Sequence, residues 1–277
     1  MAVQEISVNG TALHAEDTGE ENLPPLLCLH SLFLDGRMFD GLASAAKGWS
    51  RVIHPDFRGQ GQSDLHDVEE IIMELCAEDI EALVEKLGLY DVSMAAQAMG
   101  GAVSVRFISH NQEKHRALAM MGSSACAELD DQLDVFREWV NGVRPQAFTG
   151  SSLDETMDIM FGQTTQANPD QAEMVALWRN RIGELPKSLL PAMVGVVARK
   201  SALHIVEDIS IPVLVFSGEE DQPRPPAWSD QVAELLPINR LKRLLGIGHS
   251  NILEAPEVVI PSTLEFYDLP AKLTRVH

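Results

Sequence analysis

Short apolar runs alternate with longer amphipathic segments along most of this chain. The apolar runs predict buried strands at residues 26–29, 52–54, 91–95, 117–121, 211–217 and 241–245. Between and after them, helical spacing of apolar positions predicts a long helix over 70–87 and a final helix over 257–267. This alternation is typical of a mostly parallel sheet covered by helices, so the pattern indicates an α/β fold.

The start of the chain carries a different signal. Residues 6–15 alternate apolar and polar positions with a period of two around Asn9-Gly10. An Asn-Gly pair between alternating segments is a strong signal for a β-hairpin, because both residues tolerate the positive φ of a tight turn. We therefore predict that the fold opens with an antiparallel hairpin.

The middle third of the sequence lacks strand-like runs. Between about residues 128 and 208 helical spacing dominates, with helices expected at 129–140, 153–161, 171–182 and 187–202. A return of buried strands after residue 208 indicates that this segment interrupts one core. We predict an eight-stranded α/β core formed by 1–127 and 209–277, with a helical cap inserted at 128–208.

Composition excludes several classes of partner. The 277 residues include 41 acidic and 21 basic residues, giving a net charge of −20, and 45% are hydrophobic. A surface of that sign repels phosphates, so neither nucleic acid nor an anionic membrane is an expected partner. The acidic residues are dispersed, which is typical of a solvated surface.

Cysteine usage and the chain start suggest a compartment. Cys28, Cys76 and Cys126 are odd in number and far apart, without the spacing of a disulfide framework or a zinc site. Neither a signal-peptide pattern nor an apolar run of membrane-spanning length is visible. These features predict a cytoplasmic protein, and they leave a homodimer open as its oligomeric state.

The most informative segment follows the strand expected at 91–95. Residues 96–101 read A-Q-A-M-G-G and lead into an apolar, helical-looking stretch. A strand, a sharp turn and a helix are the context of the nucleophile elbow G-x-S-x-G, in which a serine stands at the apex. Ala98 occupies that apex, and its methyl group cannot attack a carbonyl.

Four further segments around it carry recognisable motifs. The first strand-end loop reads Leu29-His30-Ser31-Leu32, and residues 56–63 read D-F-R-G-Q-G-Q-S. Later, residues 216–223 read F-S-G-E-E-D-Q-P after a buried strand, and residues 246–249 read G-I-G-H.

Together these motifs resemble the α/β-hydrolase fold, and the likeness extends from about residue 5 to about residue 267. The resemblance implies Ala98 at the nucleophile position, Asp221 as the acid and His249 as the base of a triad, in that family's chain order. It also implies an oxyanion hole formed by the backbone N–H groups of Leu32 and Met99. The 56–63 loop is architectural in that family, and His30 is expected to be a hydrogen-bonded structural residue.

Other residues compete with two of these assignments. Glu219 and Glu220 are the rivals of Asp221 for the role of the acid. Other serines near the motifs do not stand at a strand-turn-helix apex, so a displaced nucleophile is not expected; they are Ser31, Ser104, Ser123 and Ser124. The remaining histidines lack metal-ligand spacing, and no cofactor or metal is expected.

The sequence carries less information about the substrate. Residues 31–40 resemble the corresponding loop of 3-oxoadipate enol-lactonases, which implies a small ester or lactone as the substrate. We expect Ser31, Trp139, Met160 and Trp178 to contribute to the substrate pocket, because aromatic and thioether side chains of the cap can line an apolar cavity.

Three functions remain open. The first is a serine hydrolase of carboxylic esters or lactones, represented by a nucleophile-to-alanine variant that has lost its acyl-enzyme chemistry. The second is a natural, non-catalytic binding or sensor protein on the same scaffold. The third is a C–C hydrolase, lyase or cofactor-free oxygenase that uses the His–Asp pair, since fold alone does not separate reaction types.

Overall fold

A computed structural model describes residues 1–65, 68–146 and 148–268. Within them one sheet of eight strands has the order β1-β2-β4-β3-β5-β6-β7-β8. β2 pairs antiparallel with both of its neighbours, and the remaining pairs of the sheet are parallel. The strands are β1 Ala2–Val8, β2 Thr11–Asp17, β3 Pro25–Leu29, β4 Arg51–Pro55, β5 Val92–Gln97, β6 His115–Met121, β7 Val213–Gly218 and β8 Asn239–Leu244.

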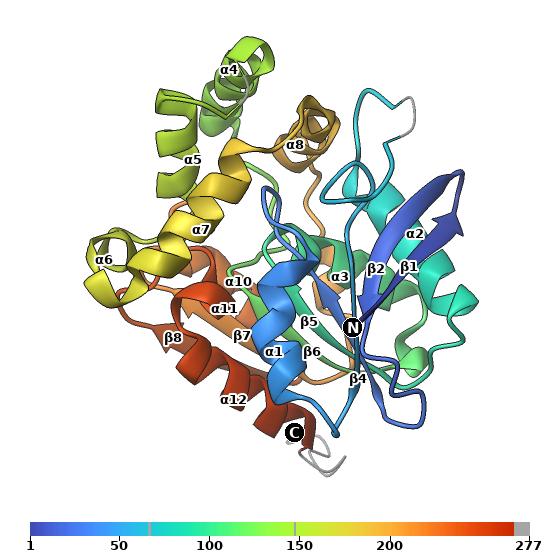
Figure 1. The fold of residues 1–277 in the computed structure, drawn as a ribbon. Helices are drawn as coiled ribbons and strands as arrows, with labels where there is room; N and C mark the ends of the chain where they lie inside the picture. The colour runs from blue at the N-terminus through green and yellow to red at the C-terminus, as the bar shows by residue number, and fades with distance from the viewer. Residues whose placement is uncertain (66–67, 147, 269–277) are drawn as a thin grey trace.

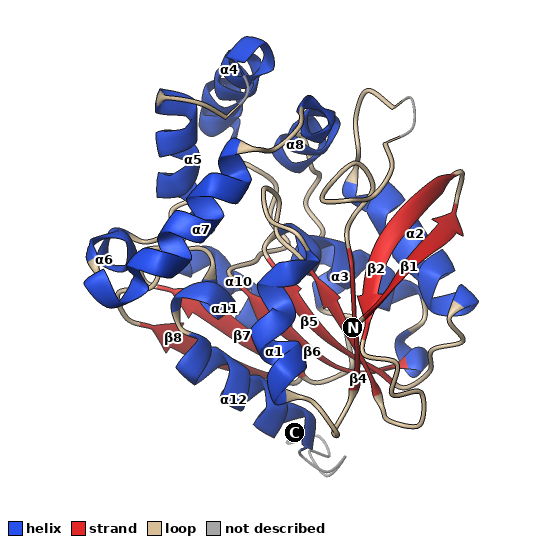
Figure 2. Cartoon of the chain, in the orientation of Figure 1, coloured by secondary structure: helices blue, strands red, loops and turns tan. Residues whose placement is uncertain are grey.

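Helices cover both faces of this sheet (Figures 1 and 2). On one face α1 packs against α12, and on the other α2 packs against α3, while α10 contacts β7 and β8. These helices are α1 Asp40–Ala45, α2 Met73–Lys86, α3 Met99–His110, α10 Pro226–Leu235, α11 Asn251–Glu254 and α12 Pro256–Asp268. Short 3-10 helices occur at Gly36–Phe39, Gln112–Lys114, Pro169–Gln171 and Lys187–Leu189. The expected fold class is confirmed: the chain has the α/β-hydrolase fold.

The opening hairpin is confirmed in register. Ile6 pairs with Leu13 and Val8 pairs with Thr11, so the turn falls on Asn9 and Gly10. Both turn residues have positive φ, 39° and 75°, which the short polar side chain and the glycine accommodate.

Every element between β6 and β7 in the described residues is a helix. The α-helices are α4 Asp130–Gln146, α5 Ser151–Met160, α6 Gln163–Ala167, α7 Ala172–Gly183, α8 Leu190–Val197 and α9 Leu203–Val206. We call residues 130–206 the helical segment; in Figure 1 most of its helices lie above the sheet. The division into a core of 1–127 with 209–277 and a cap of 128–208 stays a prediction.

Two details differ from the sequence-based expectation. The helix expected at 187–202 is a 3-10 turn followed by α8, which ends at Val197. A Cβ on Gly195 of α8 would lie 1.9 Å from the Ile71 carbonyl oxygen, so this helix passes close to the loop before α2. The sequence pattern also did not predict α10, which begins with Pro226 at the first helical position, where the missing N–H of a proline costs nothing.

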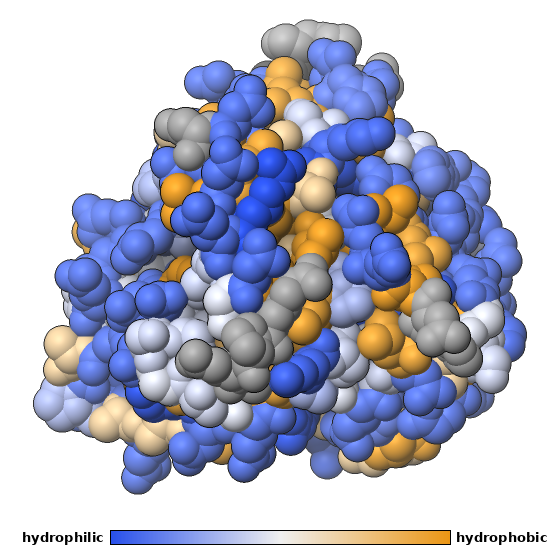
Figure 3. Space-filling view, turned by 90° about the horizontal axis from the view of Figure 1, so that it is seen from above, coloured by the Kyte–Doolittle hydropathy of each residue, from blue (hydrophilic) through white to orange (hydrophobic). Residues whose placement is uncertain are grey.

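The surface agrees with the composition. The face in Figure 3 is largely hydrophilic, with hydrophobic side chains gathered in separate patches. All three cysteines are buried and unpaired. In the part of the chain that the structure describes, no helix combines the length and the apolar character needed to cross a bilayer.

Candidate active site

The strand order places a crevice at the carboxyl ends of β3 and β5. The chain leaves β3 toward β4 on one side and leaves β5 toward β6 on the other, so the connections from these two neighbouring strands run in opposite directions. In open α/β sheets ligands bind at such a switch point, outside the carboxyl ends of the strands. The loop after β3 begins with His30, and β5 ends at Gln97, directly before Ala98.

Ala98 has the backbone of an elbow apex. It lies between β5 and α3 with φ 51° and ψ −110°, a conformation that residues with a Cβ rarely adopt. Its N–H donates to the Met121 carbonyl at 2.9 Å, and its own carbonyl accepts from Ser123 Oγ at 2.6 Å. These bonds on both sides of the residue hold the strained turn in place.

The helix after the apex approaches β3 closely. A Cβ on Gly100 would lie 2.1 Å from the Leu29 carbonyl oxygen, and one on Gly101 would lie 2.2 Å from Ser123 Oγ. Gly100 also donates its N–H to the His30 carbonyl at 3.1 Å. The two glycines are therefore required by the packing of α3 against the strand ends.

The loop after β3 presents backbone donors to the same place. Leu32 and Met99 line one pocket with Ala98, and their N–H groups have no acceptor among the described residues. Met99 is the first residue of α3, where the N–H groups of a helix have no partner within the helix. The arrangement can bind an oxygen that carries developing negative charge.

His30 supports this loop and does not reach the pocket. It is fully buried, its Nε2 accepts the Phe57 N–H at 2.9 Å, and its Nδ1 lies 2.7 Å from the Ser31 carbonyl. Since one ring nitrogen accepts, the other carries the proton and donates. The expected structural role of His30 is in agreement with these contacts.

The acid and base expected from the sequence lie together. His249 Nδ1 is 3.0 Å from Asp221 Oδ1 and 3.1 Å from Oδ2, and both side chains are buried. The same carboxylate accepts the Arg224 N–H at 2.9 Å. Because the carboxylate engages Nδ1, it fixes the tautomer that leaves Nε2 available for proton transfer, and His249 also lines the pocket of Ala98.

The rivals of Asp221 lie elsewhere. Glu219 accepts from the Gly246 N–H at 3.0 Å, and Glu220 accepts from the Thr164 N–H at 2.9 Å. Neither bonds to His249 in the hydrogen bonds of the described residues. The geometry therefore favours Asp221 as the partner of the histidine.

Two buried side chains that the sequence analysis missed hold the histidine loop. Gln97 Nε2 donates to the His249 carbonyl at 2.5 Å and so ties the loop to the end of β5. Glu254 accepts the N–H groups of Gly248 and Ser250 at 2.9 and 2.8 Å, and also that of Gly162 at 2.9 Å from the helical segment. Burial raises the pKa of Glu254, while these N–H donors oppose that rise.

The 56–63 loop is architectural, as expected. Asp56 accepts the N–H groups of Gly36 and Gln62, both at 2.8 Å. Arg58 forms a buried, two-pronged ion pair with Asp79 at 2.7 and 2.8 Å. These contacts tie the 56–63 loop to the 3-10 helix before α1 and to α2, and none of these residues lines the pocket.

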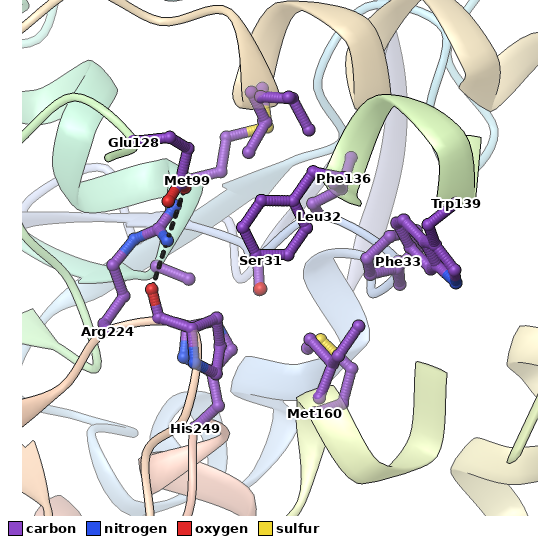
Figure 4. Close-up of a pocket in the computed structure, with 15 residues that line it drawn as sticks. Ser31, Leu32, Phe33, Met99, Glu128, Phe136, Trp139, Met160, Arg224 and His249 are labelled. Carbon is purple, nitrogen blue, oxygen red and sulfur yellow. Dashed lines mark hydrogen bonds and ion pairs between the residues drawn. The ribbon is translucent and has the colours of Figure 1, made fainter. Parts of the chain in front are cut away.

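The pocket beside Ala98 has a cavity volume of about 60 Å³, more than the space that one water molecule needs. Figure 4 shows Glu128, Arg224 and His249 on one side and Phe33, Trp139 and Met160 on the other. Its lining residues are Ser31, Leu32, Phe33, Ala98, Met99, Glu128, Phe136, Trp139, Ile159, Met160, Val196, Val197, Pro223, Arg224 and His249.

Three of the four expected substrate residues line this pocket, and one does not. Ser31, Trp139 and Met160 are in its wall, and the buried Ser31 hydroxyl has no hydrogen-bond partner among the described residues. Trp178 does not line the pocket: it is buried in α7, with the Arg181 guanidinium 4.6 Å from its ring centre. Its placement in the pocket was wrong, because helical spacing does not separate an aromatic that packs between elements from one that faces a cavity.

Comparison with known proteins identifies the family. A model of the alpha/beta hydrolase family matches residues 26–261. The chain belongs to the alpha/beta hydrolase family.

This alpha/beta hydrolase is similar over nearly its whole length to several characterised proteins. It is 24% identical to a pimeloyl-[acyl-carrier protein] methyl ester esterase of Nitrosomonas europaea, covering 89% of this chain and 96% of the relative. It is 21% identical to 3-oxoadipate enol-lactonase 1 of Acinetobacter baylyi, covering 91% of each. A thermophilic esterase from Thermogutta terrifontis superposes with a TM-score of 0.84 at 25% identity, covering 95% of this chain and 96% of the esterase.

Proposed function

We propose that this alpha/beta hydrolase binds a small carboxylic ester or lactone, and that Ala98 stands where a serine would attack its carbonyl. The observation that carries the proposal is the backbone of Ala98. Its φ of 51° is positive, and an alanine side chain gains nothing from this conformation. Strain of this kind is retained where the surrounding structure holds a side chain at a functional position.

The groups around Ala98 support acyl transfer. The N–H groups of Leu32 and Met99, which have no acceptor among the described residues, suit the oxyanion of a tetrahedral intermediate. His249, with Nδ1 on Asp221, suits a base that accepts a proton from a hydroxyl and returns it to the leaving group. The names of the relatives, a methyl ester esterase and an enol-lactonase, favour the same bond type.

Without a hydroxyl at position 98 the chain has no nucleophile for an acyl-enzyme. We therefore expect the protein to bind an ester or lactone and to turn it over very slowly. In this account the helical segment acts as a cap, and its side chains Phe136, Trp139 and Met160 close the pocket over the bound acyl group.

The test is to restore the missing hydroxyl. Ala98→Ser should raise hydrolysis of short p-nitrophenyl esters or of small lactones by about 10⁶-fold, the scale on which loss of a catalytic serine acts. The matched control is the double variant Ala98→Ser with His249→Ala, which has the hydroxyl and lacks its base. A folded Ala98→Ser protein that gains no hydrolysis of any ester or lactone would overturn the proposal and favour a binding protein.

A second candidate function rests on the intact His249–Asp221 pair. Such a pair can remove a proton from a bound substrate without any covalent intermediate. If the Ala98 chain already converts a substrate, and His249→Ala abolishes that conversion, base chemistry without a nucleophile is the better account.

A further inference from the structure

A buried cluster of three charged side chains forms one wall of the pocket. Glu128 Oε1 accepts from Arg199 Nη1 at 2.5 Å and from Arg224 Nη1 at 3.0 Å. The exposed fractions of the three side chains are 7% for Glu128, 2% for Arg199 and 7% for Arg224. One carboxylate therefore serves two guanidinium groups, and the cluster has an excess of one positive charge.

The two arginines are not equivalent. Arg199 lies behind Glu128, where its Nε donates to the Cys126 carbonyl at 2.9 Å and its Nη1 to the Val196 carbonyl at 2.7 Å. Burial and the neighbouring Arg224 guanidinium lower the pKa of Arg199 to about 9, so it remains a cation at neutral pH. Arg199 thus neutralises Glu128 from the side away from the pocket.

Arg224 is left with unused charge and unused donors. Its Nη1 donates to Glu128 and to the Pro223 carbonyl, and among the described residues no acceptor pairs with its Nε or Nη2. Asp221 accepts only the backbone N–H of Arg224 and otherwise engages His249. Arg224 shares the single Glu128 carboxylate with Arg199, so its charge is only partly balanced, and this arrangement favours an anionic partner.

The position of Arg224 indicates where an anionic partner would lie. Arg224 and Glu128 line the pocket together with Ala98, Met99 and His249. In Figure 4 they stand across the pocket from the apolar wall of Phe33 and Trp139. An anion at Arg224 would therefore belong to the same small molecule whose carbonyl reaches Ala98.

We propose that this pocket contains a carboxylate subsite, and that its substrate is an ester or lactone with a free carboxylate away from the reacting carbonyl. Arg224 supplies the recognition, because a guanidinium presents parallel N–H donors that match the two oxygens of a carboxylate. Glu128 orients Arg224, and Arg199 pairs with the same carboxylate. The statement that the substrate is an ester or lactone rests on the proposed function. The carboxylate subsite rests only on the cluster of Glu128, Arg199 and Arg224.

Binding to the protein as it stands tests the subsite without any turnover. Monomethyl glutarate and dimethyl glutarate differ by one charge and one methyl group, and the affinity of each can be measured by isothermal titration calorimetry. We expect the monoester to bind about 10- to 100-fold more tightly, the range of one charge-assisted hydrogen-bonded pair. The preference should weaken as the salt concentration rises.

Arg224→Gln should abolish this preference while leaving the affinity for the neutral diester within about twofold. The matched control is Arg51→Gln, which removes another ion-paired arginine, the partner of Asp17 at the amino end of β4, away from the pocket. That variant should retain the full preference. If Arg224→Gln does not fold, the comparison of the two glutarate esters on the parent protein decides alone.

Equal affinities of the parent for both esters would overturn the subsite, as would an Arg224→Gln variant that weakens both equally. A preference for the monoester together with an inert Ala98→Ser variant would support the subsite and refute the proposed hydrolase function. Hydrolysis by Ala98→Ser without any preference for the charged ester would support the proposed hydrolase function and refute the subsite.

Discussion

The end of the sheet and the helical segment contribute to the pocket in different ways. At the sheet end, positions are fixed mainly by backbone: the strained turn at Ala98, the close approach of Gly100 to β3 and the His249 carbonyl, which accepts a hydrogen bond from Gln97. The helical segment contributes mainly apolar side chains, such as Trp139 from α4 and Met160 from α5.

Under the proposed function, the chemistry belongs to the sheet end, and the fit of the apolar part of the substrate belongs to the helical segment. A rigid backbone frame holds charged and polar groups within the small tolerances that proton transfer requires. Apolar walls tolerate substitution of size and shape at lower cost, and they determine which acyl group fits. Apart from Arg224, which we propose binds a carboxylate, changes at the sheet end should therefore alter rate, and changes in the helical segment should alter affinity.

The largest effect is expected at the sheet end. In the Ala98→Ser background, Asp221→Asn should lower kcat by about 10⁴-fold, because the amide no longer holds His249 in the tautomer that accepts a proton. Steady-state hydrolysis of a p-nitrophenyl ester measures it. A loss of less than about 10-fold, with the fold intact by circular dichroism, would remove Asp221 from the proposed mechanism.

A second histidine, at the opposite end of the sheet, should affect stability alone. His115 begins β6, is buried against Phe107, and has no hydrogen-bond partner for either ring nitrogen among the described residues. Burial lowers its pKa from 6.5 to about 4.

As the pH falls, the unfolded chain therefore binds a proton at His115 before the folded chain does. The contribution of neutral His115 to the free energy of unfolding is present above pH 6.5 and is lost as the pH falls toward 4. Between pH 7.5 and pH 5 the loss should be about 2 kcal/mol. His115→Leu should remove that part of the pH dependence in urea unfolding, without changing ligand affinity at pH 7.5. An unchanged pH dependence would show that His115 is not the group responsible.

The smallest effect is expected within the helical segment, and two tryptophans provide the contrast. In the Ala98→Ser background, Trp139→Leu should raise KM about 10-fold with little change in kcat, because it removes part of the pocket wall. Trp178→Leu should instead lower the melting temperature and leave KM unchanged, since Trp178 packs beside Arg181 outside the pocket. The reverse result would exchange the roles of the two residues.

Sequence alone predicted much of the fold and the chemical centre, because those features depend on local patterns. Period-two alternation around Asn9-Gly10 identified the hairpin, and strand-turn-helix context identified Ala98. The G-x-G-H loop and the acidic turn before residue 223 gave His249 and Asp221, which the structure brings within hydrogen-bonding distance.

The missed residues act through partners far away in the chain. Glu254 bonds to Gly162 across 92 positions, and Arg224 bonds to Glu128 across 96, so no local spacing indicates either contact. Trp139 and Trp178 occupy similar helical patterns, and only the packing of the helices decides which of them meets the pocket. Tertiary contacts of this kind set the walls and the charge of the site.

The central claim is that position 98 is a nucleophile position in an otherwise assembled site. Labelling with a fluorophosphonate probe, followed by peptide mass spectrometry, tests it most directly, because such probes form covalent adducts only with activated hydroxyls. We predict that the Ala98 chain is not labelled, that Ala98→Ser is labelled at position 98, and that adding His249→Ala abolishes the labelling. A folded Ala98→Ser protein that stays unlabelled at position 98 would contradict the account.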